Sequence, residues 1–172
     1  MVIPADSCVS FCDSIALVIC FTLPIKEVGL MLELKRLDIE DARLLIEGAR
    51  IRANEIGVPM CIAITDESGN LIAFERMDGG KTTSVTIAQD KAYTAAAARK
   101  ATHEYNAACT PGSLVFGIHT SMGGRLCVVG GGYPVESNGQ VVGGIGLSSG
   151  TPMQDMECAQ AGIEYWQQQT QQ

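Results

Sequence analysis

The chain has 172 residues, of which 47% are hydrophobic and 18% charged, and its formal net charge is −7. This composition excludes a disordered chain and predicts a compact fold, while the lack of a Lys/Arg-rich stretch argues against nucleic acid or an anionic membrane as a partner. The seven cysteines are scattered and form no C-x-x-C pair, which favours free thiols in the reducing cytoplasm over a disulfide framework or a zinc site.

The first thirty residues are expected to lie outside the folded domain. The apolar run at residues 15–23 is too short to span a bilayer, and acidic rather than basic residues precede it, unlike a secretory signal. Residues 26–28 (KEV) can be encoded by a sequence that resembles a bacterial ribosome-binding site just before Met31. We therefore interpret residues 1–30 as a non-domain extension, either an artefact of translation start or a loosely docked segment, and residues 31–172 as one domain.

A helix followed by a hairpin is predicted at the start of that domain. Apolar residues recur at helical spacing over residues 38–56, and Asp38 with Asp41 resembles a capping box. Residues 58–64 form a nearly continuous apolar run, which is typical of a strand buried on both faces. Turn residues join it to a second strand over residues 71–77, so we expect the two strands to pair.

An alanine-rich helix is predicted next, from about Ser84 to His103, with a small face that another backbone can approach closely. The C-terminal third predicts strands over residues 125–130, 132–136 and 140–147, with a further short one near residues 116–119. Asn-Gly between the last two apolar runs predicts a tight hairpin turn. A T-x-x-Q capping box at Thr151 opens the final helix, which is expected to end near residue 167.

Glycine occurs eight times between Gly130 and Asp155. A dinucleotide loop is disfavoured, because the preceding strand belongs to a hairpin, Gly150 comes one residue late for G-x-G-x-x-G, and no acidic residue follows at the right distance. The glycines instead predict a patch poor in side chains, able to receive the alanine-rich helix, a flat ligand or another subunit. The start of the last helix at Thr151 could hold an anionic group beside this patch.

Three segments together carry a family resemblance: VPMCIAITDESGNLIAFERMDG, IAQDKAYTAAA and GGGYPVESNGQVVGGIGLSSGTPMQD. They resemble the GlcG/HbpS family of haem-binding proteins, whose domain also forms the C-terminal part of PduO-type proteins of cobalamin metabolism. The resemblance covers about residues 38–166. It implies an α+β, profilin-like fold with an antiparallel five-stranded sheet in the order α-β-β-α-β-β-β-α, and assembly as a homo-oligomer. Ser149 stands where the family usually has glycine.

The candidate ligand-binding residues lie on the alanine-rich helix, the first hairpin and the glycine patch. His103 is the candidate ligand of haem iron, although a histidine that ends a helix is also favoured there by the helix dipole. Arg76 and Lys91 could bind haem propionates or a substrate carboxylate. His119 and Cys109 are weaker candidates for chemistry. The residues expected to line the patch are Gly131, Gly132, Gly144 and Ser148.

These features predict a small cytoplasmic tetrapyrrole-binding protein, with haem preferred over cobalamin, that is accessory to a metabolic operon. The alternatives are an enzyme acting on a small carboxylate or a diol-derived metabolite, an accessory domain associated with a corrinoid adenosyltransferase, and an oligomeric scaffold without chemistry. The sequence motifs leave these alternatives open.

Overall fold

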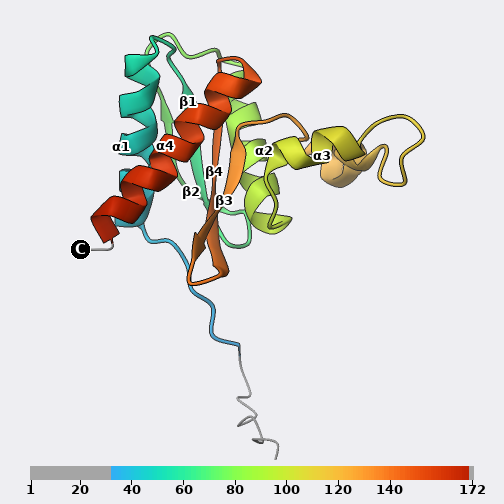
Figure 1. Ribbon diagram of the computed structural model, residues 1–172, viewed down its shortest axis with the longest axis horizontal. Helices are drawn as coiled ribbons and strands as arrows, with labels where there is room; N and C mark the ends of the chain where they lie inside the picture. Colours follow the sequence, from blue (N-terminus) through green and yellow to red (C-terminus); the bar gives the residue numbers. More distant parts are fainter. Residues whose placement is uncertain (1–31, 171–172) are drawn as a thin grey trace, which may run out of the picture. The chain divides into compact units, whose positions relative to one another are not determined.

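The computed structural model describes residues 32–170. The interpretation of residues 1–30 as an extension lies outside the described residues, and the compact unit begins at Glu33. Its elements follow one another along the chain as shown in Figure 1. They are α1 (Ile39–Glu55), β1 (Cys61–Asp66), β2 (Leu71–Arg76), α2 (Ser84–Ala97), α3 (Thr102–Ala108), the 3₁₀ helix η1 (Ile118–Gly124), β3 (Gly132–Ser137), β4 (Gln140–Ser148) and α4 (Pro152–Thr170).

The strands form one antiparallel sheet in the order β2-β1-β4-β3. The predicted α+β class is confirmed, but the described residues contain four strands, so the prediction of five is wrong. The fifth was expected at residues 125–130. There the side chain of Thr94 on α2 accepts a hydrogen bond from the amide of Cys127 (2.8 Å) and donates one to the carbonyl of Arg125 (3.2 Å). These backbone groups therefore pair with a helix side chain instead of a strand.

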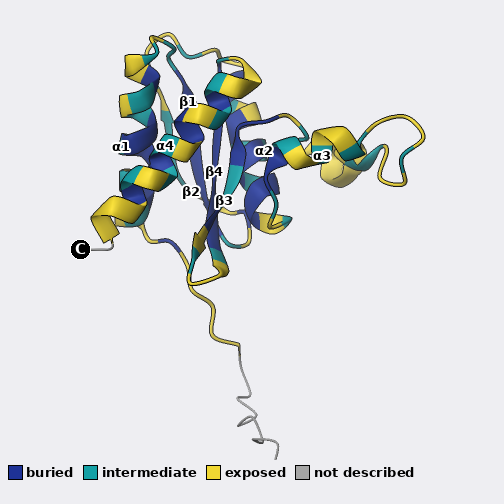
Figure 2. Ribbon diagram, viewed as in Figure 1, coloured by how far each residue is buried: buried dark blue, intermediate teal, exposed yellow. Residues whose placement is uncertain are grey.

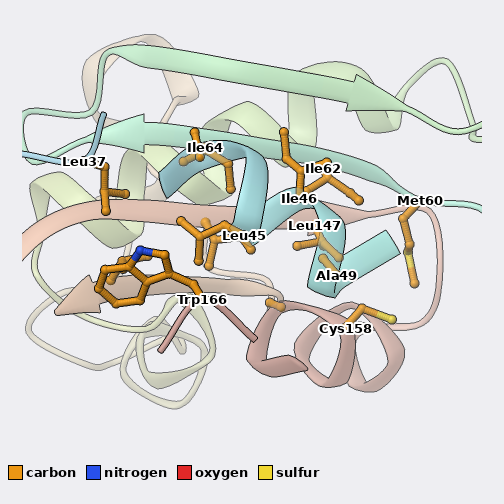
Figure 3. Packing of buried hydrophobic residues seen from close by; sticks show 14 of the residues in the cluster. Leu37, Leu45, Ile46, Ala49, Met60, Ile62, Ile64, Leu147, Cys158 and Trp166 are labelled. Carbon is orange, nitrogen blue, oxygen red and sulfur yellow. The ribbon is translucent and has the colours of Figure 1, made fainter. Parts of the chain in front are cut away.

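The sheet is covered on both faces. Helices α1 and α4 pack together on one face, and α2 lies on the other, against β1 and β4 (Figure 1). The burial pattern in Figure 2 follows these layers, since the sides of the helices that face the sheet are buried. The main core lies between the sheet and the α1/α4 layer, where Ile62, Ile64 and Leu147 meet Leu45 and Trp166 (Figure 3).

The alanine-rich segment forms two helices, which corrects the prediction of one long helix. Helix α2 ends at Ala97, and Arg99 takes a left-handed conformation (φ 52°). The amide of Arg99 then bonds to the carbonyl of Ala96 and the amide of Lys100 to that of Ala95, which is the Schellman arrangement that terminates a helix. His103 is consequently the second residue of α3 and not the last residue of a helix, so the suggestion that it is a histidine favoured at a helix C-terminus is wrong.

The predicted caps and the predicted hairpin turn are confirmed. Asp38 and Asp41 form the reciprocal capping box at the start of α1. Thr151 and Gln154 bond to each other's backbone amides at the start of α4. Asn138 (φ 51°) and Gly139 form the tight turn between β3 and β4. These features depend on residues three or fewer apart, which explains why the sequence predicts them.

Candidate functional site

Most of the predicted site residues lie at one end of the sheet. The strand register places Arg76 opposite Cys61, and Cys61 opposite Ser148, in one row across β2, β1 and β4. The carbonyl of Gly131 extends this row toward β3, where it accepts a hydrogen bond from the amide of Leu147 (2.9 Å). This end of the sheet is therefore the place where α2, α3 and the start of α4 converge on the glycine-rich chain.

A buried ion pair occupies the centre of this region. Lys91 is 1% exposed, and its Nζ donates to Asp155 Oδ2 at 2.7 Å and to the carbonyl of Leu147 at 2.8 Å. Asp155 Oδ1 accepts from the amide of Gly150 at 3.0 Å. Burial raises the pKa of Asp155, although Lys91 and the Gly150 amide favour the charged form. Lys91 thus links α2 to α4, and its amine is engaged inside the protein, not presented to a carboxylate ligand.

Gly131 and Gly132 allow the chain to approach these groups closely. Gly131 has φ +118°, and a Cβ there would lie 2.8 Å from Lys91 Nζ and 2.7 Å from Asp155 Cβ. A Cβ on Gly132 would lie 2.5 Å from the carbonyl oxygen of Lys91. The hydroxyl of Thr102 accepts from the amide of Gly132 and donates to its carbonyl. Packing between α2, α3 and β3 therefore accounts for both glycines.

Gly144 receives the alanine-rich helix. A Cβ at this position would lie 2.5 Å from the carbonyl oxygen of Ala92 and 3.0 Å from the Cβ of Ala96. Of the three occupants considered for the glycine patch, α2 covers this part, and no flat ligand has room there in this structure. The amides at the start of α4 are also engaged, since Gly150 donates to Asp155 and Thr151 to Gln154. The suggested anion site at Thr151 is thus filled by the protein's own side chains.

His103 lies beside this packed centre, next to the edge strand β3. A Cβ on Gly130 would lie 3.4 Å from His103 Cβ and 2.7 Å from Met156 Sδ. The ring of His103 faces that of Tyr133, with 5.6 Å between the centroids. Among the described residues, the buried side-chain atoms without a hydrogen-bond partner are His103 Nδ1 and Tyr133 Oη. Burial raises the pKa of Tyr133, and the neighbouring charge of Glu104 adds to this effect.

The remaining predicted residues are not part of this cluster. Arg76 is exposed at the end of the edge strand β2. Ser148 is buried, and its hydroxyl bonds to that of Ser84 at 3.1 Å. His119 lies on η1, where its Nδ1 is 3.0 Å from Cys109 Sγ. The structure thus brings Lys91, Gly131, Gly132 and His103 into one cluster. Arg76 and Ser148 lie in the row at the same end of the sheet, and Gly144 and His119 lie elsewhere.

Two residues that matter most at this end were not singled out by the sequence. Asp155 lies close to the glycine patch along the chain, but only the folded structure identifies it as the partner of Lys91. Tyr133 follows the three glycines at the start of β3, and nothing in its local pattern indicates that it contacts a histidine thirty residues earlier. Both assignments depend on contacts between distant segments.

No group of three or more His, Cys, Asp or Glu side chains in the part that the structure describes could hold a metal ion. A hollow of about 850 Å³ lies at the other end of the sheet, beside the β3–β4 turn and Trp166. Within residues 32–170, no helix has the length and apolar character needed to cross a membrane.

Several known proteins are similar to this chain in sequence and in fold. The model of the family "Haem degrading protein HbpS-like" matches residues 37–164. A 15.0 kDa protein from the dhaT-dhaS intergenic region of Citrobacter freundii is 37% identical over 123 residues, which are 72% of this chain and 87% of the relative. The corrinoid adenosyltransferase PduO of Citrobacter freundii is 36% identical over 127 residues, which are 74% of this chain and 38% of the relative.

Two solved structures are similar to this chain in fold and in sequence. The Klebsiella pneumoniae protein ORFY has a TM-score of 0.79 and 30% identity, over 80% of this chain and 95% of that structure. The PduOC:heme complex has a TM-score of 0.73 and 34% identity, over 76% of this chain and 94% of that structure. The match to the adenosyltransferase PduO covers only 38% of that longer protein. The chain belongs to the HbpS-like family, which confirms the resemblance to GlcG, HbpS and PduO-type proteins carried by its sequence motifs.

Proposed function

We propose that the protein binds a tetrapyrrole, with haem preferred over a corrinoid, as a cytoplasmic accessory protein of a metabolic operon. Two kinds of observation support the proposal. The family is described by haem chemistry, and a homologous domain with 34% identity forms a complex with haem. In this chain, the observation that carries the proposal is the unpartnered imidazole of His103 at the edge of the sheet. A buried polar atom without a partner is rare in a native structure and points to a role.

The donor set of this region fits haem iron. Neutral imidazole is a common axial ligand, and of the two ring nitrogens of His103 only Nδ1 is buried without a partner. His103 would supply that imidazole to the iron. Tyr133 lies beside the ring of His103, and Met156 lies beside Gly130, next to His103; both would provide apolar contact for a porphyrin. The haem itself would supply redox chemistry at its iron, while His103 would hold the ring at the edge of β3.

The experiment is an absorbance titration of the protein with haemin. We expect a Soret band for the wild type, and His103→Ala should shift its maximum and weaken binding by about 1–3 kcal/mol, the loss expected for one strong polar partner. His119→Ala is the matched control, because it removes the other histidine from a different segment, and it should leave the titration unchanged. Identical spectra for wild type and His103→Ala would remove His103 from the site.

A corrinoid is the second candidate ligand, and the match to the adenosyltransferase PduO favours it. The same titration with cobalamin distinguishes the two tetrapyrroles. Saturable spectral changes with haemin alone support the first proposal, and saturable changes with cobalamin alone would replace it by the second. A protein that responds to neither ligand would contradict tetrapyrrole binding altogether.

A further inference from the structure

One pair of side chains outside the tetrapyrrole region has the geometry of a reactive thiol. Cys109 follows directly after α3, and its Sγ lies 3.0 Å from Nδ1 of His119, ten residues further along the chain. A cysteine within hydrogen-bond distance of an imidazole is the arrangement in which the base takes the thiol proton and leaves a nucleophilic thiolate. We propose that Cys109 and His119 form a peroxide-reactive thiol site, distinct from the region around His103.

The backbone between the two residues holds them in place. Successive turns are closed by hydrogen bonds from the amide of Ser113 to the carbonyl of Thr110 and from the amide of Phe116 to that of Ser113. The hydroxyl of Thr120 caps the next turn at the carbonyl of Gly117. The segment thus folds back on itself and returns His119 to the end of α3. The contact is therefore part of a formed loop.

The surroundings of His119 favour transfer of the thiol proton of Cys109 to its Nδ1. The ring of Phe116 packs against that of His119 in an edge-on arrangement, with 6.3 Å between the centroids, so the imidazole has an apolar neighbour that orients it. Cys109 is half-buried and His119 is exposed. A small oxidant can consequently reach the sulfur, while the imidazole can exchange its proton with water.

The other described cysteines lack this combination. Cys61 and Cys158 are buried. Burial raises the pKa of Cys61 and of Cys127, and it raises that of Cys158 to about 11. A thiol in such surroundings stays protonated and inert. Cys109 is thus the described cysteine in which partial exposure coincides with an adjacent base.

The reaction can be written with a hydroperoxide as the oxidant. The thiol proton of Cys109 passes to His119 Nδ1, and the thiolate attacks one oxygen of hydrogen peroxide. An S–O bond forms and the O–O bond breaks, and the departing hydroxide takes the proton from His119 to give water. The sulfur is oxidised by two electrons to a sulfenic acid, and the peroxide is reduced.

The first test is alkylation of the full chain by iodoacetamide at pH 7, followed cysteine by cysteine with peptide mass spectrometry. An ordinary thiol with a pKa near 8.5 is about 3% thiolate at pH 7, so complete transfer of the proton to histidine would raise the thiolate fraction about thirtyfold. The gain in alkylation rate is smaller, because a stabilised thiolate is a weaker nucleophile. We therefore expect Cys109 to be alkylated about tenfold faster in the wild type than in His119→Gln, while Cys127 reacts at the same rate in both proteins. Glutamine can still hydrogen-bond but cannot take the proton.

Cys61 and Cys158 serve as internal controls, because they become reactive only if a variant unfolds. If Cys61 and Cys158 become reactive in His119→Gln, the same measurements are made with His119→Asn instead. The second test is trapping of the sulfenic acid with dimedone after addition of hydrogen peroxide, which should label Cys109 in the wild type and much less in the variant. A rate of alkylation at Cys109 that His119→Gln leaves unchanged or raises would overturn the proposal.

Discussion

Replacing Lys91 by methionine should strongly destabilise the protein. The change keeps an unbranched side chain of similar length but removes a charge that is 1% exposed and bonded to Asp155 and to the carbonyl of Leu147. Removing one partner of a buried pair leaves the other uncompensated, which typically costs about 3–5 kcal/mol. We expect Lys91→Met to lower the free energy of unfolding by this amount near neutral pH.

The loss should depend on pH, because the carboxyl left behind can be neutralised. Burial already raises the pKa of Asp155 above its ordinary value, and Lys91 is the largest influence that lowers it. Without Lys91 the pKa of Asp155 rises further. The folded variant then binds a proton that the unfolded chain releases, so the contribution of Asp155 to stability is largest in acid and falls as pH rises through the window between its pKa values in the unfolded and folded states. The destabilisation should be smaller at pH 5 than at pH 8.

The assay is urea unfolding of the wild type, Lys91→Met, Asp155→Asn and the double variant at both pH values. Because the two side chains are in direct contact, the double variant should lose about 2 kcal/mol less than the sum of the two single losses. The asparagine side chain that Asp155→Asn introduces carries no charge, and its oxygen can still accept from the amide of Gly150. Additive losses, together with a Lys91→Met loss that is equal at pH 5 and pH 8, would refute the reasoning.

Three further outcomes are expected. Gly146→Ala should destabilise the protein by about 3 kcal/mol or more in thermal unfolding, because its Cβ would overlap the carbonyl oxygen of Ala88; the control Gly57→Ala meets nothing within 4 Å and should lose only about 1 kcal/mol from its positive φ. A chain that starts at Met31 should keep the thermal midpoint of the full chain within about 2 °C, as expected for a terminal segment that makes no essential contact; a large drop would make residues 1–30 part of the fold. Light scattering at micromolar concentration should report a homo-oligomer, since large apolar side chains such as Leu71 and Met153 are exposed; the mass of a single chain would contradict this.

The parts of the fold that the sequence predicts are those decided by neighbouring residues. The capping boxes at Asp38 and Thr151 depend on side chains that bond to backbone groups three residues away, and the turn at Asn138 depends on a positive φ that asparagine and glycine adopt readily. Continuous apolar sequence in β1 indicates a strand covered on both faces. The α+β class could also be predicted from the sequence, because the family motifs are recognised by their order along the chain.

The tertiary structure alone decides what happens where two distant segments meet. The side chain of Thr94 takes the backbone groups of residues 125 and 127, and this prevents the predicted fifth strand. Helix α2 stops at Ala97 through a left-handed Arg99, a conformation rare for a residue with a side chain, so local propensity indicates continuation. As a result His103 lies in the first turn of a new helix, and its ring faces that of Tyr133.

The candidate site follows the same division. The sequence by itself determined which residue types were available: two histidines, a lysine within an alanine-rich helix and a concentration of glycines. It left open whether the glycines face a ligand or a helix. The structure decides this, because α2 fills the space above Gly144, and Lys91 is paired with Asp155. The two residues of this ion pair are 64 positions apart in the sequence. Their burial and pairing depend on how distant segments pack, which local composition and spacing do not indicate.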